Sequence, residues 1–198
     1  MKEELELQLI EKNPEVFLFH NFRGRGHFVF ECDDGWYNIL NAMFNNITSN
    51  IRYNNKRLNE LMEAQDMIDN GCRDQVPDYL QQRISSLNNG NGEWPVEMEF
   101  PVVQQIKEKF GTLNVYVRKY DDRTQDLIGF AESMSATTCE RCGNIGELRK
   151  GSWIKTLCDE HEKERQALLA ERAAEQASYE KNYMDNEWDK VENTSKKH

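Results

Sequence analysis

The chain has 198 residues, of which 38% are hydrophobic and 30% charged, and its net charge is −10. No apolar run approaches the roughly 18 residues that a membrane-spanning helix needs, and the N-terminal sequence lacks the basic start and small-residue cleavage site of a secretory signal. We therefore expect a cytoplasmic protein with reduced cysteines, in which the acidic charge disfavours broad binding to nucleic acid.

The N-terminal segment predicts a helix followed by a hairpin. Residues 3–12 form an acidic amphipathic stretch that Pro14 closes. Residues 15–20 and 27–31 are rich enough in aromatic residues to pair as two strands. The loop between them contains Arg-Gly-Arg-Gly at residues 23–26, for which an exposed turn and a phosphate-binding loop are both open.

A long helix is predicted next. Asp33 or Asp34 is placed to cap it, and apolar residues recur over residues 36–68 in alternating steps of three and four. Several asparagines, which are poor helix formers, predict a break near residues 53–56. We expect another helix of the same chain to cover the apolar stripe, and a dimer through residues 58–68 is the alternative.

The period of the apolar residues then changes. A helix over residues 77–87 leads into a polar loop at residues 88–93, which is the best candidate for an internal hinge. Residues 102–108 and 113–117 predict two strands. Residues 122–135 return to the spacing of a helix with one apolar face.

Four residues form the pattern C-x2-C-x15-C-x2-H: Cys139, Cys142, Cys158 and His161. Two close pairs of thiolate and imidazole ligands, joined by enough chain for a hairpin, are what a tetrahedral zinc ion requires. Because four protein ligands leave no coordination position open, we expect a structural Zn²⁺ ion. A hairpin over residues 147–155 and a helix that begins near the second ligand pair indicate a treble-clef or zinc-ribbon type of finger.

The metal pattern divides the chain into three parts. We expect an α+β domain over residues 1–135, the zinc finger over residues 136–161 and an acidic helical tail over residues 162–198. The fold class is therefore α+β. The two remaining cysteines, Cys32 and Cys72, are predicted to be ordinary reduced thiols, because no Cys-His-acid arrangement surrounds them.

Two surfaces are candidates for binding a partner. Between the first and third zinc ligands, four basic residues against two acidic ones give a local charge of +2. The candidate nucleic-acid contacts there are Arg149, Lys150, Trp153 and Lys155, with an ordinary solvated hairpin as the alternative. In the tail, the candidate partner-binding residues are Asp185, Glu187, Trp188 and Asp189, with a frayed end as the alternative.

Several motifs together resemble a family of uncharacterised proteins encoded by bacteriophages and prophages. They are IKEKFGTL at 106–113, Ala131-Glu132 with Ser135, TCERCG at 138–143 and WIKTLC at 153–158 with His161, and a fainter match covers residues 31–36. The resemblance implies a zinc-containing protein made in an infected or lysogenic bacterium. It brings no established activity with it.

Three classes of function are open. We favour a non-enzymatic, zinc-stabilised binding protein whose acidic surface engages a protein of the bacterial host or of an antiviral defence system, as the resemblance implies. The first alternative is a zinc finger that binds nucleic acid. The second is a treble-clef nuclease, for which we recognise no catalytic residues. His161 is already assigned as a metal ligand, and nothing near His20 or His27 has a recognisable catalytic spacing for a general base.

Overall fold

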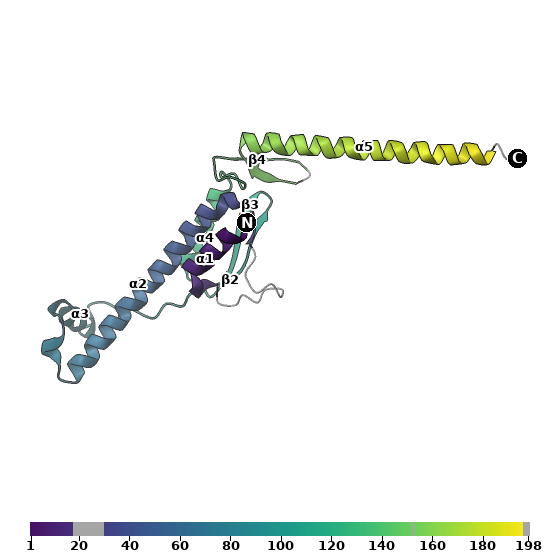
Figure 1. The fold of residues 1–198 in the computed structure, drawn as a ribbon. Helices are drawn as coiled ribbons and strands as arrows, with labels where there is room; N and C mark the ends of the chain where they lie inside the picture. The colour runs from purple at the N-terminus through teal and green to yellow at the C-terminus, as the bar shows by residue number, and fades with distance from the viewer. Residues whose placement is uncertain (18–29, 152, 196–198) are drawn as a thin grey trace.

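The structure is a computed structural model that describes residues 1–17, 30–151 and 153–195, with side chains up to residue 181 and at Tyr183. A three-stranded sheet and its helices form a body, from which a two-helix extension and a long C-terminal helix project at opposite ends (Figure 1). The predicted α+β class is confirmed. None of the described helices is long and apolar enough to cross a membrane.

The N-terminal segment differs in part from the prediction. Helix α1 (Glu3–Lys12) forms as predicted, but the next residues form a 3-10 turn, η1 (Pro14–Val16), where a strand was expected to begin. The ring of a proline fixes φ at a helical value. The N–H that proline lacks would have no partner at the first position of a helix, so Pro14 favours the turn. Strand β1 (Phe30–Glu31) pairs in parallel with β2 (Val102–Lys109), a partner far away in the sequence.

Helix α2 (Tyr37–Asp69) follows the 3-10 turn η3 (Asp34–Trp36). The predicted cap from residues 33–34 is wrong, because the N-cap position is occupied by a tryptophan and no side chain caps the first turn. The carboxylate of Asp34 instead accepts a hydrogen bond from the backbone amide of Lys2 at 2.7 Å and pairs with its ammonium group at 3.1 Å. Asp34 therefore ties the start of the chain to the start of α2.

The break predicted at residues 53–56 is also wrong, since α2 is continuous over 33 residues. The side-chain amide of Asn54 donates to the carbonyl of Val96 at 3.0 Å. Asn55 exchanges two hydrogen bonds with the main chain of Met98, at 2.9 and 2.8 Å. These bonds to the segment that precedes β2 offset the low helix propensity of asparagine.

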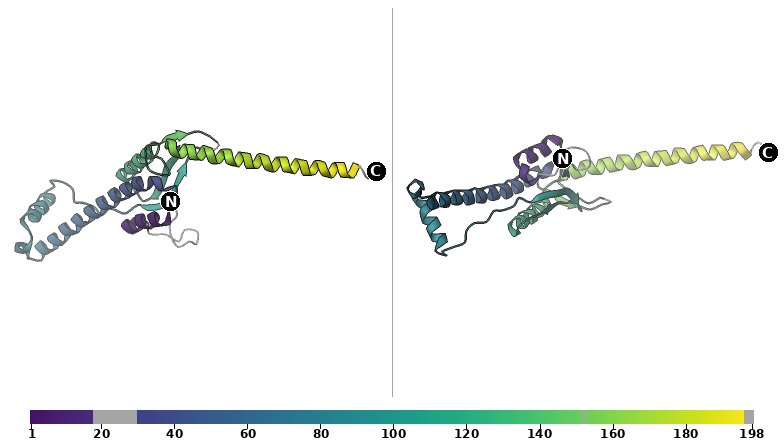
Figure 2. Two further views of the ribbon diagram at one scale, coloured as in Figure 1. Left: turned by 45° about the horizontal axis from the view of Figure 1, so that its top comes forward. Right: turned by 90° about the horizontal axis from the view of Figure 1, so that it is seen from below.

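The second half of α2 packs against α3 (Asp78–Asn88), and the connection contains the 3-10 turn η4 (Arg73–Gln75). These elements enclose a small core of their own, whose buried residues are Leu61, Ala64, Val76, Ile84 and Leu87. The predicted helix over residues 77–87 is confirmed, and so is the expectation that another helix covers the stripe. Two further views place this extension at the end of the molecule opposite the C-terminal helix (Figure 2).

The body is built around β2 and its antiparallel neighbour β3 (Thr112–Arg118), as predicted, in a sheet of order β1-β2-β3. Helix α4 (Asp122–Ser135) has the predicted bounds and packs on β3 and α2. The largest fully buried side chains of the chain include Phe17, Phe30, Trp36, Phe44, Leu40, Ile106 and Leu113. Helix α1, β1, α2 and the sheet therefore share one core.

The C-terminal part begins after α4. A short hairpin of β4 (Glu147–Arg149) and β5 (Lys155–Leu157) is confirmed, and α5 (Asp159–Ser195) starts directly behind it. Helix α5 covers the predicted helical tail up to Ser195. It leaves the body beside the hairpin and extends away from it (Figure 1).

Candidate metal centre

The four predicted ligands lie together and form a candidate metal site. The Sγ atoms of Cys142 and Cys158 are 3.8 Å apart. Nδ1 of His161 lies 3.4 Å from Sγ of Cys139 and 3.3 Å from Sγ of Cys158. All four ligand atoms are within 4.8 Å of one another.

The first ligand pair sits in a tight knuckle. The amide of Gly143 donates to the carbonyl of Cys139 at 2.9 Å, and the amide of Cys139 donates to the carbonyl of Asn144 at 2.7 Å. Gly143 has a φ of +79°, a left-handed conformation that glycine adopts without steric cost. The turn therefore brings the sulfur atoms of Cys139 and Cys142 to the same side.

The second ligand pair is placed by the start of α5. Cys158 lies between β5 and α5, and its carbonyl accepts the amide of Glu162 at 2.9 Å, the first hydrogen bond of the helix. His161 is in the first turn of α5, three residues after Cys158. Residues three apart on a helix share a face, so both side chains point to the knuckle.

The thiols of the site favour a bound cation. Burial acts to raise the pKa of Cys139, but hydrogen bonds from the backbone at Cys158, Cys142 and Arg141 outweigh it and hold that pKa below its usual value. Removal from water, together with the neighbouring thiols, raises the pKa of Cys142 to about 11. Since close thiolates repel one another, a cation between them would offset this repulsion and favour the deprotonated thiols.

The knuckle is docked onto the body through two residues of η3. The amide of Gly35 donates to the carbonyl of Glu140 at 2.7 Å, and the indole Nε1 of Trp36 donates to the carbonyl of Thr138 at 2.9 Å. A Cβ atom on Gly35 would lie only 2.2 Å from the carbonyl oxygen of Cys139. Sequence reasoning did not assign this contact, although residues 31–36 belong to the motifs of the phage-family resemblance.

A buried charged group lies where the finger meets the sheet. The carboxylate of Glu140 is 1% exposed and lies 2.7 Å from Nζ of Lys155, which is also 3.3 Å from the carboxylate of Glu108 on β2. Burial raises the pKa of Glu140 although Lys155 opposes the shift. Burial acts to lower the pKa of Lys155, but the hydrogen bond and charge of Glu140 outweigh it and raise that pKa. Lys155 thus links the finger to the sheet.

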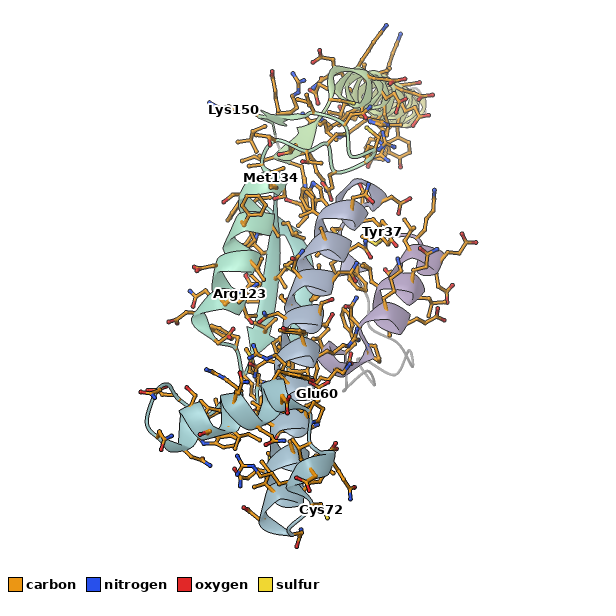
Figure 3. All side chains as sticks on the ribbon, turned by 90° about the vertical axis from the view of Figure 1, so that its left-hand side faces the viewer. Tyr37, Glu60, Cys72, Arg123, Met134 and Lys150 are labelled. Carbon is orange, nitrogen blue, oxygen red and sulfur yellow. The ribbon has the colours of Figure 1, made fainter. Side chains whose placement is uncertain are left out.

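Two of the four candidate nucleic-acid contacts are held in ion pairs, and two are exposed. The guanidinium of Arg149 pairs with Asp159 at 2.5 Å and donates to the carbonyl of Leu157 at 3.2 Å. Lys155 is held by the two glutamates described above. Lys150 and Trp153 are exposed, and Lys150 lies at the outer edge of the finger (Figure 3). Of these four residues, only Lys150 and Trp153 therefore have exposed side chains.

Other predicted residues are less informative. The side chains of the tail candidates Asp185, Glu187, Trp188 and Asp189 are outside the described part, as are the Arg-Gly-Arg-Gly loop, His20 and His27. Cys32 is buried, and burial raises the pKa of its thiol to about 12, which makes it a poor nucleophile. Cys72 is partly exposed in the connection after α2.

Comparison with models of protein families, with curated proteins and with solved structures found no match for this chain. The resemblance to phage and prophage proteins therefore stays a prediction.

Proposed function

We propose that the metal is zinc and that it is structural. Zinc bound by three thiolates and one imidazole has bond lengths of about 2.0–2.3 Å, which places neighbouring ligand atoms of a tetrahedron about 3.5–3.8 Å apart. Three of the separations in the site are 3.3, 3.4 and 3.8 Å. A set of three sulfurs and one nitrogen suits zinc, and four protein ligands fill its coordination sphere.

We infer from this site a non-enzymatic binding protein in which zinc fixes a long helix, α5, for docking on another protein. The observation that carries the proposal is the position of His161. It is one of the four candidate metal ligands and lies in the first turn of a helix of 37 residues. The metal centre would therefore set the direction in which α5 leaves the body.

The base of α5 is held at several points besides His161. Arg141 of the knuckle pairs with Glu164 at 2.9 Å, and Arg165 donates to the carbonyl of Trp153 at 2.8 Å. Beyond this base, every described side chain from Gln166 to Lys181 is exposed. A helix of this length spans about 55 Å. Because helices in proteins are stabilised mainly by packing, such an uncovered helix is suited to gain stability from a partner.

The charge of α5 indicates the kind of partner. Residues 159–195 contain eleven acidic and five basic residues. A surface of this sign attracts a basic or basic-amphipathic protein surface and raises the rate of encounter with it. The phage-family resemblance suggests that the partner is a protein of the bacterial host or of its defence systems.

Affinity capture from bacterial lysate, followed by binding of the purified partner, tests the proposal. We expect the triple variant Asp185→Lys, Glu187→Lys and Asp189→Lys to weaken the complex at least tenfold at low salt and to keep its metal. The matched control is Glu63→Lys, Asp66→Lys and Asp69→Lys, which makes the same charge change at the far end of α2. Equal effects of the two triple variants, or no effect of either, would contradict a docking role for α5.

A further inference from the structure

An exposed phenylalanine occupies a strained position in the turn between β2 and β3. The central residues of this turn, Phe110 and Gly111, have φ values of +53° and +82°. Turns with two positive φ values favour Asn-Gly, and a bulky residue in this region is an outlier. The Phe110 side chain is 71% exposed, so burial in a core does not explain its presence. Strained residues of this kind concentrate at functional sites.

A second exposed aromatic ring is held close to the same turn. Trp153, in the loop between β4 and β5, is 67% exposed. Its indole Nε1 donates to Oε2 of Glu108 at 3.1 Å, and the other oxygen of this carboxylate accepts the amide of Gly111 at 2.7 Å. The Glu108 side chain is only 8% exposed. One nearly buried carboxylate therefore positions both the Trp153 ring and the turn that carries Phe110.

The turn and the hairpin are also in direct contact. A Cβ atom on Gly111 would lie 2.5 Å from Cδ1 of Leu148 and 3.2 Å from Cγ2 of Ile154. The hydroxyl of Thr156 donates to the carbonyl of Gly111 at 2.7 Å. The two aromatic residues are therefore carried by one packed unit of sheet and finger.

We propose that Phe110 and Trp153 form a stacking site for single-stranded nucleic acid, a function beyond the docking role of α5. Aromatic rings exposed on a fixed backbone bind nucleobases by stacking, with lysines nearby to contact the phosphates. Lys109 and Lys150 are exposed, and Nζ of Lys109 lies 5.6 Å from the centre of the Phe110 ring. Lys109 directly precedes Phe110 in the sequence, and Lys150 lies in the loop that carries Trp153.

Stacking fits this pair better than recognition of a peptide. The indole N–H of Trp153 is already bonded to Glu108, and phenylalanine has no polar atom, so the rings offer faces but no hydrogen-bond donor. Rings that offer no donor or acceptor do not read base edges, so stacking on them is tolerant of sequence. If two lysines contact phosphates, a plot of the logarithm of the association constant against the logarithm of the salt concentration should have a slope of about −1.4.

Fluorescence anisotropy with labelled single-stranded 12-mers of DNA and RNA tests the site on the full chain. An abasic 12-mer of equal charge separates stacking from attraction to phosphates. We expect the intact strands to bind at least tenfold more tightly than the abasic strand. Phe110→Asn and Trp153→Ala should each reduce binding of the intact strands about tenfold. The matched control is Tyr79→Ala on α3, which removes a ring that is also 67% exposed but lies at the far end of the molecule.

Phe110→Asn keeps the turn, because asparagine tolerates positive φ, so its circular dichroism and metal content should equal those of the wild type. Equal binding of intact and abasic strands would overturn the proposal. So would an affinity for intact strands that neither Phe110→Asn nor Trp153→Ala changes, or that Tyr79→Ala reduces to the same extent. A site that serves a protein partner instead would give equally weak binding of every oligonucleotide.

Discussion

The indole of Trp36 donates to the main-chain carbonyl of Thr138, one residue before the first metal ligand, across 102 positions of sequence. The Trp36 side chain is fully buried in the main core. The adjacent amide of Gly35 bonds to the carbonyl of Glu140, inside the knuckle itself. The start of α2 and the metal site therefore form one structural unit, and damage to either should be measurable in the other.

Gly35→Ala tests this unit. The new Cβ would meet main-chain atoms of Cys139, Glu140 and Gly143 at 2.2–2.6 Å, which cannot be relieved by a side-chain rotation. We expect a loss of about 1–3 kcal/mol in the free energy of unfolding, measured by urea denaturation. Gly129→Ala on α4 is the control, because nothing lies within 4 Å of its added methyl group. Gly129→Ala should gain about 0.5–1 kcal/mol in the free energy of unfolding. An equal change in the two variants would refute the close contact between Gly35 and the knuckle.

Lys155→Ala tests the buried charged group. It would leave the carboxylate of Glu140, which is 1% exposed, without its cation. Removal of one member of a buried ion pair typically costs about 3–5 kcal/mol. Because Lys155 is partly exposed, we expect a smaller loss of about 2–3 kcal/mol in the free energy of unfolding. Lys150→Ala, in the same hairpin but exposed, should change stability by less than about 0.5 kcal/mol. Comparable losses in the two variants would show that the charged group around Lys155 does not stabilise the contact of the finger with the sheet.

The start of α4 gives a prediction of pH dependence. The side chain of Asp121 accepts a hydrogen bond from the amide of Thr124 at 2.8 Å, and this bond holds the pKa of Asp121 below its usual value. A lowered pKa in the folded state stabilises the protein above the unfolded pKa of about 3.9, and this contribution is lost as pH falls through the folded pKa.

Asp121→Ala should therefore cost about 1 kcal/mol at pH 7 and progressively less below about pH 4. Urea denaturation at pH 7 and at pH 3 measures both values. Asp126→Ala, on the exposed side of the same helix, should show a smaller cost at pH 7. If Asp121→Ala lowered the free energy of unfolding equally at both pH values, the ionised Asp121 side chain would not cap α4.

Much of the fold was predictable from local patterns. The bounds of α4 agree with the prediction, and those of α3 are displaced by one residue, because periodicity and turn residues act over a few positions. The parallel pairing of β1 with β2 was not predictable, since the two strands are about 70 residues apart. The continuous α2 was missed for a related reason, because Asn54 and Asn55 are stabilised by a segment some 40 residues away.

In the candidate site, too, local features were predictable and contacts between distant residues were not. Its four ligands follow from short spacings within one hairpin, and those spacings brought them together as expected. Whether Lys155 contacts Glu108 depends on how β2 lies against the finger, which the sequence does not show. Lys155 was therefore predicted as a surface cation, whereas the structure pairs it with two largely buried glutamates. The strained turn at Phe110 was predicted only as a connection between strands, because φ cannot be read from residue types alone.

Removal of the metal should act locally. A chelator strong enough to extract zinc is expected to unfold the knuckle and hairpin, because structural zinc sites are coupled to folding. The second core between α2 and α3 lies at the far end of the molecule and should persist. Hydrogen exchange followed by mass spectrometry would then show lost protection at Glu140 and Gly143 and retained protection at Leu87. Uniform loss across both regions would contradict this separation.

The most direct test is the metal content of the purified protein, measured by native mass spectrometry with elemental analysis. We predict one zinc ion per chain for the wild type and for Cys72→Ser, and less than a full equivalent for Cys142→Ser and His161→Ala. The same zinc content in Cys142→Ser as in the wild type, or wild-type protein that folds without any metal, would contradict a zinc centre that fixes α5.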